Sequence, residues 1–244
     1  AMAEKLDFLK RWLATAIAFL FWAVAGTLLQ LVLLPFAKKG KQANLSTQLK
    51  IRHFVGGIWY YFIRYLSCAG ALKVSYQGFE KLGRPGQLVV VNHPSLLDVV
   101  LILSKAPSLN CIVKKDLLHN PTMRNQILAC GFIPNTESLE LLDHCERVLQ
   151  QESLLLFPEG TRIKEPGFGK AKAGLSLFAI KGKAQVVPIS IISNYKLFNR
   201  VTIFIDKPIS FEEYYKQKLT SEENERLSQN VLEVIKENYY IHSK

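Results

Sequence analysis

The sequence predicts an α/β protein in which a mixed, partly parallel sheet is flanked by helices and preceded by a membrane-associated helical hairpin. Apolar runs of strand length alternate with helical patterns along residues 69–244, and strands that alternate with helices usually pair in parallel beneath them. Before them, residues 12–36 form an almost uncharged stretch of about 25 residues, longer than the roughly 20 needed to cross a bilayer. We therefore divide the chain into a two-helix segment, residues 1–68, and an α/β domain, residues 69–244.

The first segment is too long for the core of a secretion signal. Basic residues flank both of its ends, so the positive-inside rule gives no orientation. Residues 46–66 mix aromatic and basic side chains, which is typical of a helix at a membrane interface. Together the two segments predict a hairpin that enters the cytoplasmic leaflet and returns, and a buried core helix is the alternative for the first segment.

The domain is expected to hold six strands and at least four helices in alternation. The apolar runs that predict strands are residues 72–76, 88–91, 109–113, 154–157, 186–192 and 201–205. The helical patterns are residues 96–104, 121–130, 138–151 and 171–181. The charged stretch 211–240 predicts surface helices with a packing stripe at Leu227, Val231, Val234 and Ile235. Roughly 175 residues are enough for one buried core.

Charge and cysteine content narrow the class of protein. The net charge of +11 favours anionic lipid head groups as partners, and the chain has no nucleic-acid-binding motif that would favour nucleic acid instead. The cysteines show no C-x-x-C spacing, so we predict no metal site and reduced, buried thiols in a cytosol-facing domain. These cysteines are Cys68, Cys111, Cys130 and Cys145.

His93 and Asp98, in the sequence NHPSLLD, are the candidate catalytic pair. The apolar run 88–91 leads into a helical pattern that Pro94 opens, so His93 is expected on the connection and Asp98 in the helix. A carboxylate that reaches back to one ring nitrogen leaves the other free to accept a proton. The spacing alone is common, and a structural histidine beside an exposed carboxylate is the alternative.

The second candidate block is the turn in the sequence FPEGTR, which follows the apolar run 154–157. Gly160 permits a close approach of the backbone to a ligand, and Arg162 offers a planar fork for phosphate or carboxylate. A third block, VVPISI, reads as a buried strand that contains Pro188. A proline there indicates an edge, a bulge or a ligand-facing position.

NHPSLLD, FPEGTR and VVPISI in this order resemble the glycerolipid acyltransferase family, which includes the 1-acyl-glycerol-3-phosphate acyltransferases. The resemblance implies a membrane-bound enzyme, without a cofactor, that moves a fatty acyl group to a hydroxyl of a lysophospholipid-like acceptor. The donor would be a thioester, either acyl-CoA or an acyl carrier protein. The location would be the bacterial inner membrane, beside its phospholipids, with the active site facing the cytoplasm.

The same resemblance assigns roles to the candidate residues. His93 would be the general base, and Asp98 would be its charge-stabilising partner. Pro188 would lie on the strand that walls the site. The residues that would bind the acceptor are Glu159, Gly160, Thr161 and Arg162.

The chain departs from the family pattern between the first two blocks. Phosphatidate-forming members usually carry a Gly-x-x-Phe-Ile-x-Arg segment there, whereas this chain has Gly131, Phe132, Ile133, Pro134 and Asn135 without the arginine. The residues that can replace the missing charge, or else form a solvated face, are Lys114, Lys115, Lys170 and Lys172.

The segments CIVKKDLLHNP, CGFIPN and LLDHCERVLQ are also similar to acyltransferases encoded within aryl-polyene or related lipid-linked polyketide clusters of Gram-negative bacteria. This resemblance leaves a non-glycerophosphate acceptor open. A lipid hydrolase is disfavoured because the chain lacks a Gly-x-Ser-x-Gly elbow. A non-catalytic lipid-binding membrane protein stays as the other alternative.

Overall fold

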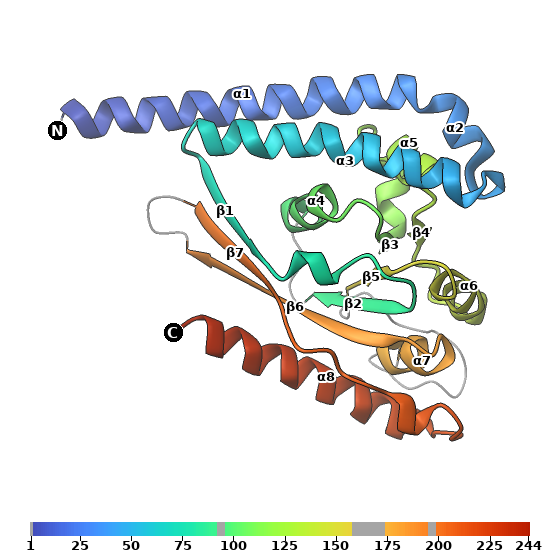
Figure 1. Ribbon diagram of the computed structural model, residues 1–244. Helices are drawn as coiled ribbons and strands as arrows, with labels where there is room; N and C mark the ends of the chain where they lie inside the picture. Colours follow the sequence, from blue (N-terminus) through green and yellow to red (C-terminus); the bar gives the residue numbers. More distant parts are fainter. Residues whose placement is uncertain (1, 92–95, 158–173, 195–198) are drawn as a thin grey trace.

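The computed structural model describes residues 2–91, 96–157, 174–194 and 199–244 (Figure 1). Within them the strands form a seven-stranded sheet in the order β1-β7-β6-β2-β5-β3-β4. The strands are β1 (Leu72–Gln77), β2 (Gln87–Val91), β3 (Asn110–Val113), β4 (Ile133–Pro134), β5 (Leu154–Leu156), β6 (Gln185–Asn194) and β7 (Asn199–Ile205). The β6–β7 pair is antiparallel and the other pairs are parallel. The predicted mixed, partly parallel sheet is confirmed, and most of its strand pairs are parallel.

Helices cover both faces of this sheet. They are α1 (Met2–Val32), α2 (Leu34–Lys39), α3 (Leu45–Cys68), α4 (Leu96–Lys105), α5 (Arg124–Cys130), α6 (Leu139–Leu149), α7 (Gly174–Lys181) and α8 (Ser221–His242). Short 3-10 turns lie at η1 (Gly40–Gln42), η2 (Phe79–Lys81), η3 (Lys115–His119) and η5 (Glu212–Tyr214). Figure 1 shows α3 and α4 on one side of the sheet and α8 on the other.

Alternation along the strands explains the two layers. Val89 and Val91 of β2 pack with α3, α4 and α5 in one core cluster. Leu88 and Val90, which alternate with these two residues along β2, pack with α6, α7 and α8 in the other cluster. Successive strand residues point to opposite faces, so a strand that is apolar at every position requires helices on both sides.

Two strands differ from their sequence expectations. Two-residue β4 was not predicted, because so short a strand carries no periodic signal. Pro188 lies in β6, which is a central strand and not an edge strand. Pro188 lies opposite Val90 of β2, and the pairing of β6 with β7 begins at the next residue, Ile189. The Pro188 carbonyl accepts a hydrogen bond from Asp206 N at 2.9 Å. The nitrogen and the carbonyl of one strand residue face the same neighbouring strand, so the proline nitrogen, which has no hydrogen to donate, faces the end of the β7 ladder. The loss of one hydrogen bond is tolerated at the end of a ladder.

The N-terminal segment folds as an antiparallel pair of helices, α1 and α3, joined by α2 and η1 (Figure 1). Pro35 near the start of α2 marks the break after α1. Asn44 caps α3 by accepting a hydrogen bond from Thr47 N at 2.8 Å. The rings of Trp22 and Trp59 lie 4.5 Å apart between the two helices.

The carboxyl-terminal part of α1 is fixed to the domain. Gln30 accepts hydrogen bonds from the backbone and side-chain nitrogens of Asn125 in α5, both at 2.6 Å. At Gly26, a Cβ atom would lie only 2.7 Å from Thr122 Cβ, so a glycine allows this close approach. Among the described helices, α1 alone is long and apolar enough to cross a membrane by length and composition, and 22% of its most apolar part is buried.

Helix α3 corrects the expectation of a purely interfacial second segment. Ile51, Val55, Trp59 and Ile63 are buried against the domain, and Arg52 on the same face is only 2% exposed. The opposite face keeps the predicted interfacial character, because Tyr60, Tyr61 and Phe54 are exposed there. One helix therefore serves as core on one side and as a surface rich in aromatic residues on the other.

Candidate functional site

Four parallel strands, β2, β5, β3 and β4, point their carboxyl ends to the same edge of the sheet. Strands β2 and β5 are neighbours, and Val90 of β2 lies opposite Leu156 of β5. Neighbouring strands are about 4.8 Å apart, so the segments that follow Val91 and Leu156 begin side by side. Ligands of open α/β sheets bind at the carboxyl ends of the strands, which makes this edge the candidate site.

The segment that holds the predicted catalytic pair begins at this edge. His93 lies outside the described residues, in the four-residue connection between β2 and α4. Asp98 is half-buried in the first turn of α4, where the helix dipole stabilises a carboxylate. The connection and the helical position of Asp98 are therefore as predicted, and the pairing of the two side chains stays a prediction.

The predicted acceptor-binding turn follows β5 at the same edge. Six of the predicted acceptor-binding residues, four in the turn and two lysines beyond it, lie outside the described part of the chain: Glu159, Gly160, Thr161, Arg162, Lys170 and Lys172. Phe157 is described and follows Leu156 directly. Because β2 and β5 are adjacent, the two motifs leave the sheet from neighbouring strand ends, as the combination of motifs requires.

A cavity of about 200 Å³ opens beside this edge, between α3, α4 and α5. Val55 and Trp59 of α3, Val100 and Leu103 of α4 and Ile127 of α5 supply apolar wall. Leu96, Lys114 and Phe157, which adjoin the strand ends, also line it. The cavity therefore extends from the candidate site into an apolar interior, which suits a hydrocarbon chain.

The two described lysines of the predicted set have different positions. Lys114 directly follows β3, is exposed and lines the cavity. Lys115 is exposed at the start of η3 and is absent from the cavity wall. Lys114 is therefore the better placed of the two to attract an anionic group at the cavity mouth.

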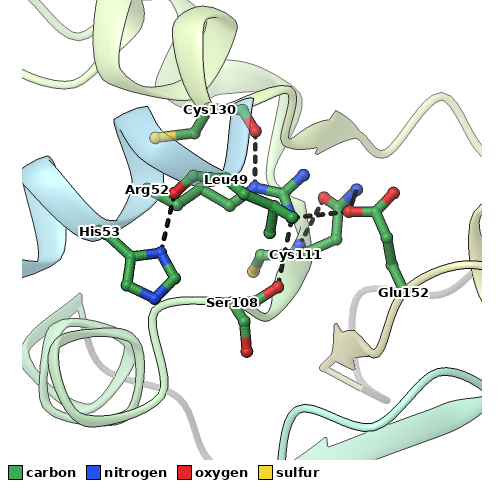
Figure 2. A network of polar contacts seen from close by, with 8 residues as sticks. Leu49, Arg52, His53, Ser108, Cys111, Cys130 and Glu152 are labelled. Carbon is green, nitrogen blue, oxygen red and sulfur yellow. Dashed lines mark hydrogen bonds and ion pairs between the residues drawn. The ribbon is translucent and has the colours of Figure 1, made fainter. Parts of the chain in front are cut away.

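A buried polar network lies where α3 meets the amino ends of β3 and β5 (Figure 2). Arg52 Nη1 donates to Glu152 Oε1 at 2.6 Å and to Ser108 O at 3.3 Å, and Arg52 Nε donates to Cys130 O at 2.7 Å. Asn110 Nδ2 also approaches Glu152 Oε1 at 3.4 Å. Arg52 Nη2 has no hydrogen-bond partner among the described residues. Arg52 also lines the cavity, so this network fixes part of its wall.

The buried cysteines have no role as nucleophiles in this arrangement. Cys111, Cys130 and Cys145 are buried as predicted, whereas Cys68 at the end of α3 is exposed. Burial raises the pKa of each of the three buried thiols to about 12, and a protonated thiol is a weak nucleophile. Within the described ranges, no group of three or more His, Cys, Asp or Glu side chains is arranged to hold a metal ion.

Sequence reasoning missed the cavity and Arg52. The signal for Arg52 was its spacing: Arg52, Val55, Gly56 and Trp59 follow the i, i+3, i+4, i+7 pattern of one helix face. A single arginine on an apolar helix face is as consistent with a buried arginine that pairs with an acid as with an arginine at a membrane interface. The cavity has no local signal, because its walls come from three helices far apart in the sequence.

The central part of the chain is similar to known acyltransferases. A family model described as acyltransferase matches residues 73–192, the part of the chain that holds β2, α4, β3, β5 and most of β6. The chain is similar to this family, and the curated relatives that it matches are named 1-acyl-sn-glycerol-3-phosphate acyltransferases.

Individual relatives support this grouping. The chain is 28% identical to 1-acyl-sn-glycerol-3-phosphate acyltransferase LPAT1 of Arabidopsis thaliana over 66% of this chain and 49% of the relative. It is 31% identical to 1-acyl-sn-glycerol-3-phosphate acyltransferase of Helicobacter pylori over 54% of this chain and 61% of the relative. The chain thus spans about half to three fifths of these curated relatives.

The fold also matches a solved structure. The crystal structure of PlsC, the 1-acyl-sn-glycerophosphate acyltransferase from Thermotoga maritima, superposes with a TM-score of 0.65 at 22% identity. The match covers 97% of this chain and 98% of that one. It therefore includes the N-terminal helices as well as the sheet.

Proposed function

We propose that this protein transfers a fatty acyl group from a thioester to a hydroxyl of a lysoglycerophospholipid at a membrane surface. The observation that carries the proposal is the position of the two motifs. The segments with His93 and Glu159 leave the sheet from the adjacent ends of β2 and β5, and an apolar cavity opens beside them.

In the proposed reaction His93 removes the proton of the acceptor hydroxyl, whose oxygen attacks the thioester carbonyl. The tetrahedral intermediate collapses, the carbon–sulfur bond breaks, and the protonated imidazole returns its proton to the leaving thiolate. Asp98 orients the imidazole and stabilises its charged form. The thioester is already activated, so the chemistry requires no covalent acyl-enzyme.

The acceptor and the donor would meet at this edge of the sheet. Glu159 to Arg162 would hold the head group, and Lys114 would add a cation at the cavity mouth. Acyl-CoA and acyl carrier protein are the candidate donors, and the cavity would take their hydrocarbon chain.

An assay of thiol release tests this function. Purified protein is given acyl-CoA or an acyl carrier protein thioester, with and without a panel of lysophospholipids. We expect release that depends on the acceptor and yields the diacyl product. Release without an acceptor would support hydrolysis instead, and no release with any pair would support a binding role.

The cavity walls should set the preferred acyl length. Val55→Phe narrows the cavity and should favour shorter chains, whereas Leu103→Ala widens it and should favour longer ones. Each buried methylene contributes about 0.8 kcal/mol, so kcat/KM should change about three- to fourfold per carbon. Competition assays with mixed acyl-CoA lengths measure this preference. Shifts in the same direction for both variants would contradict the assignment of the cavity to the acyl chain.

We also propose that residues 1–68 hold the protein on the cytoplasmic face of a bacterial inner membrane. The exposed side of α1 is apolar, with Phe19 and Leu20 at 74% and 63% exposure. The exposed flank of α3 carries Tyr60, Tyr61 and Arg64. The change from an apolar surface on α1 to an aromatic and basic surface on α3 suits α1 within the hydrocarbon and α3 at the head groups.

Leu20→Glu should weaken this attachment. The substitution replaces an exposed leucine with a charge in the part of α1 proposed to lie in lipid, so binding to phospholipid vesicles should fall by about tenfold or more. Asn230→Glu, on the exposed side of α8, adds the same charge away from the proposed surface and serves as the control. Sedimentation with vesicles measures both, and equal losses would argue against α1 as the attachment surface.

A further inference from the structure

Helix α5 forms one wall of the cavity and relies on other elements for its position. Gln126, Ile127 and Cys130 of α5 line the cavity, as does Met123 directly before it. Helix α5 has only seven residues, and so short a helix is marginal unless other parts of the protein hold it. Within the described residues, Met123 at the N-cap position makes no side-chain hydrogen bond to the first turn. The first backbone N–H groups of α5 therefore need acceptors from elsewhere.

Gln30 of α1 supplies such an acceptor. Gln30 Oε1 accepts a hydrogen bond from Asn125 N, in the first turn of α5, at 2.6 Å, and Gln30 O accepts one from Asn125 Nδ2 at 2.6 Å. The other hydroxyl or amide side chains of residues 12–32 are Thr15 and Thr27, which donate to carbonyls of their own helix. An amide on a helix that lies in lipid is unfavourable unless a partner satisfies it. The first turn of α5 is the partner of Gln30.

A second set of contacts leads from α1 to the same wall. The rings of Trp22 in α1 and Trp59 in α3 lie 4.5 Å apart, and Trp59 lines the cavity. Trp59 Nε1 donates to Gln126 Oε1 at 2.8 Å, and Gln126 Nε2 donates to Thr122 O at 2.5 Å. Trp59 and Gln126 are buried, so water does not replace these hydrogen bonds when they break. A shift of α5 would therefore disturb the α3 wall of the cavity as well.

We propose that Gln30 is a positioning residue, which caps α5 from α1 and so fixes the wall that contacts the acyl chain. Helix α1 then determines how well the acyl donor binds, in addition to holding the protein at a membrane. Gln30 is not among the described residues that line the cavity, so it acts through Asn125 and α5. The inference rests on the proposed acyltransferase function and adds a residue that controls the affinity for the donor.

Gln30→Met tests the proposal, because methionine is unbranched and of similar length but has no oxygen to accept the hydrogen bond of Asn125 N. In mixed detergent micelles, the KM for acyl-CoA should rise about fivefold, the size expected for the loss of a helix cap. The KM for the lysophospholipid should stay the same, and kcat should stay within about twofold. Gln30→Glu keeps an acceptor oxygen and should have a KM for acyl-CoA close to that of the wild type.

Three outcomes of this assay would overturn the assignment. They are an unchanged KM for acyl-CoA in Gln30→Met, an equal rise in the KM values of both substrates, and an equal rise in the KM for acyl-CoA in Gln30→Met and Gln30→Glu. Thr27→Val is the matched control. Thr27 lies about one turn before Gln30, is exposed, and donates to Ala23 O within α1, so this variant should keep both KM values.

Amide hydrogen exchange measures the position of α5 without any turnover. In Gln30→Met, the amides of residues 124–130 should exchange about fivefold faster, while those of α8 keep their wild-type rates. Faster exchange in both helices would show a general loss of stability and would contradict the proposal, as would unchanged exchange in α5. Absence of transfer to every acceptor by the wild-type protein would contradict the proposed acyltransferase function instead, and the exchange of α5 would still test the role of Gln30 as its cap.

Discussion

His93→Ala is expected to lower acceptor-dependent thiol release about 10²- to 10⁴-fold, the usual contribution of a general base. The loss should appear in kcat, because the imidazole acts on the proton of the hydroxyl and contributes little to holding the lipid. Asp98→Asn should also lower kcat, since an amide cannot stabilise the imidazolium. Residues that act as a unit are not additive, so the double variant should be no slower than His93→Ala.

The control is His53→Ala. His53 is exposed on α3 and its ring nitrogen is hydrogen-bonded to Leu49 O at 2.8 Å, within its own helix. This variant should keep wild-type activity. A His93→Ala protein that is folded and retains activity within tenfold of wild type would exclude His93 as the base. A double variant far slower than both single variants would show that Asp98 acts independently of His93.

The parts of the fold that sequence could predict are those with a local, periodic signal. Residues 88–91 are apolar at every position, and the structure buries β2 on both faces. Leu227, Val231 and Ile235 form the buried stripe of α8, and Val234 beside them is half-buried. The helix α8 is a single element from Ser221, where Thr220 and Glu223 form a capping box.

The parts that could not be predicted depend on long-range contacts. Ile133 and Pro134 form a strand only because β3 lies beside them. Arg52 was interpreted as an interfacial residue because its partners, Ser108, Cys130 and Glu152, lie 56 to 100 residues away. Within the site, the order of motifs indicated a family of enzymes, but the shared edge of the sheet and the cavity beside it required the pairing of β2 with β5 and the packing of α3 on α4 and α5. The positive φ angle of Glu137, 53°, likewise has no sequence signature.

The largest expected effect on stability is that of Arg52→Met. The Arg52 and Glu152 side chains are 1% and 10% exposed, and breaking a buried ion pair from one side typically costs about 3–5 kcal/mol. Among the described residues, the variant leaves the Glu152 carboxylate with only the long contact to Asn110 at 3.4 Å. It also removes the donor to Cys130 O. Denaturant unfolding in detergent micelles measures the loss.

The control for this stability effect is Lys181→Met. Lys181 forms an ion pair with Asp143 between α7 and α6, and both side chains are exposed. Water solvates such a pair in the folded and unfolded states alike, so the variant should unfold like the wild type. Similar losses for Lys181→Met and Arg52→Met would contradict the distinction between exposed and buried pairs.

Arg52→Met combined with Glu152→Met should recover much of the stability that Arg52→Met loses, because the methionines fill the space and no buried charge is left without a partner. The coupling energy from the double-mutant cycle should therefore be about 1.5–3 kcal/mol. Recovery should be incomplete, since the carbonyls of Cys130 and Ser108 lose their donor in both variants. Additive losses would show that Arg52 stabilises the protein through these carbonyls and its packing, and not through Glu152.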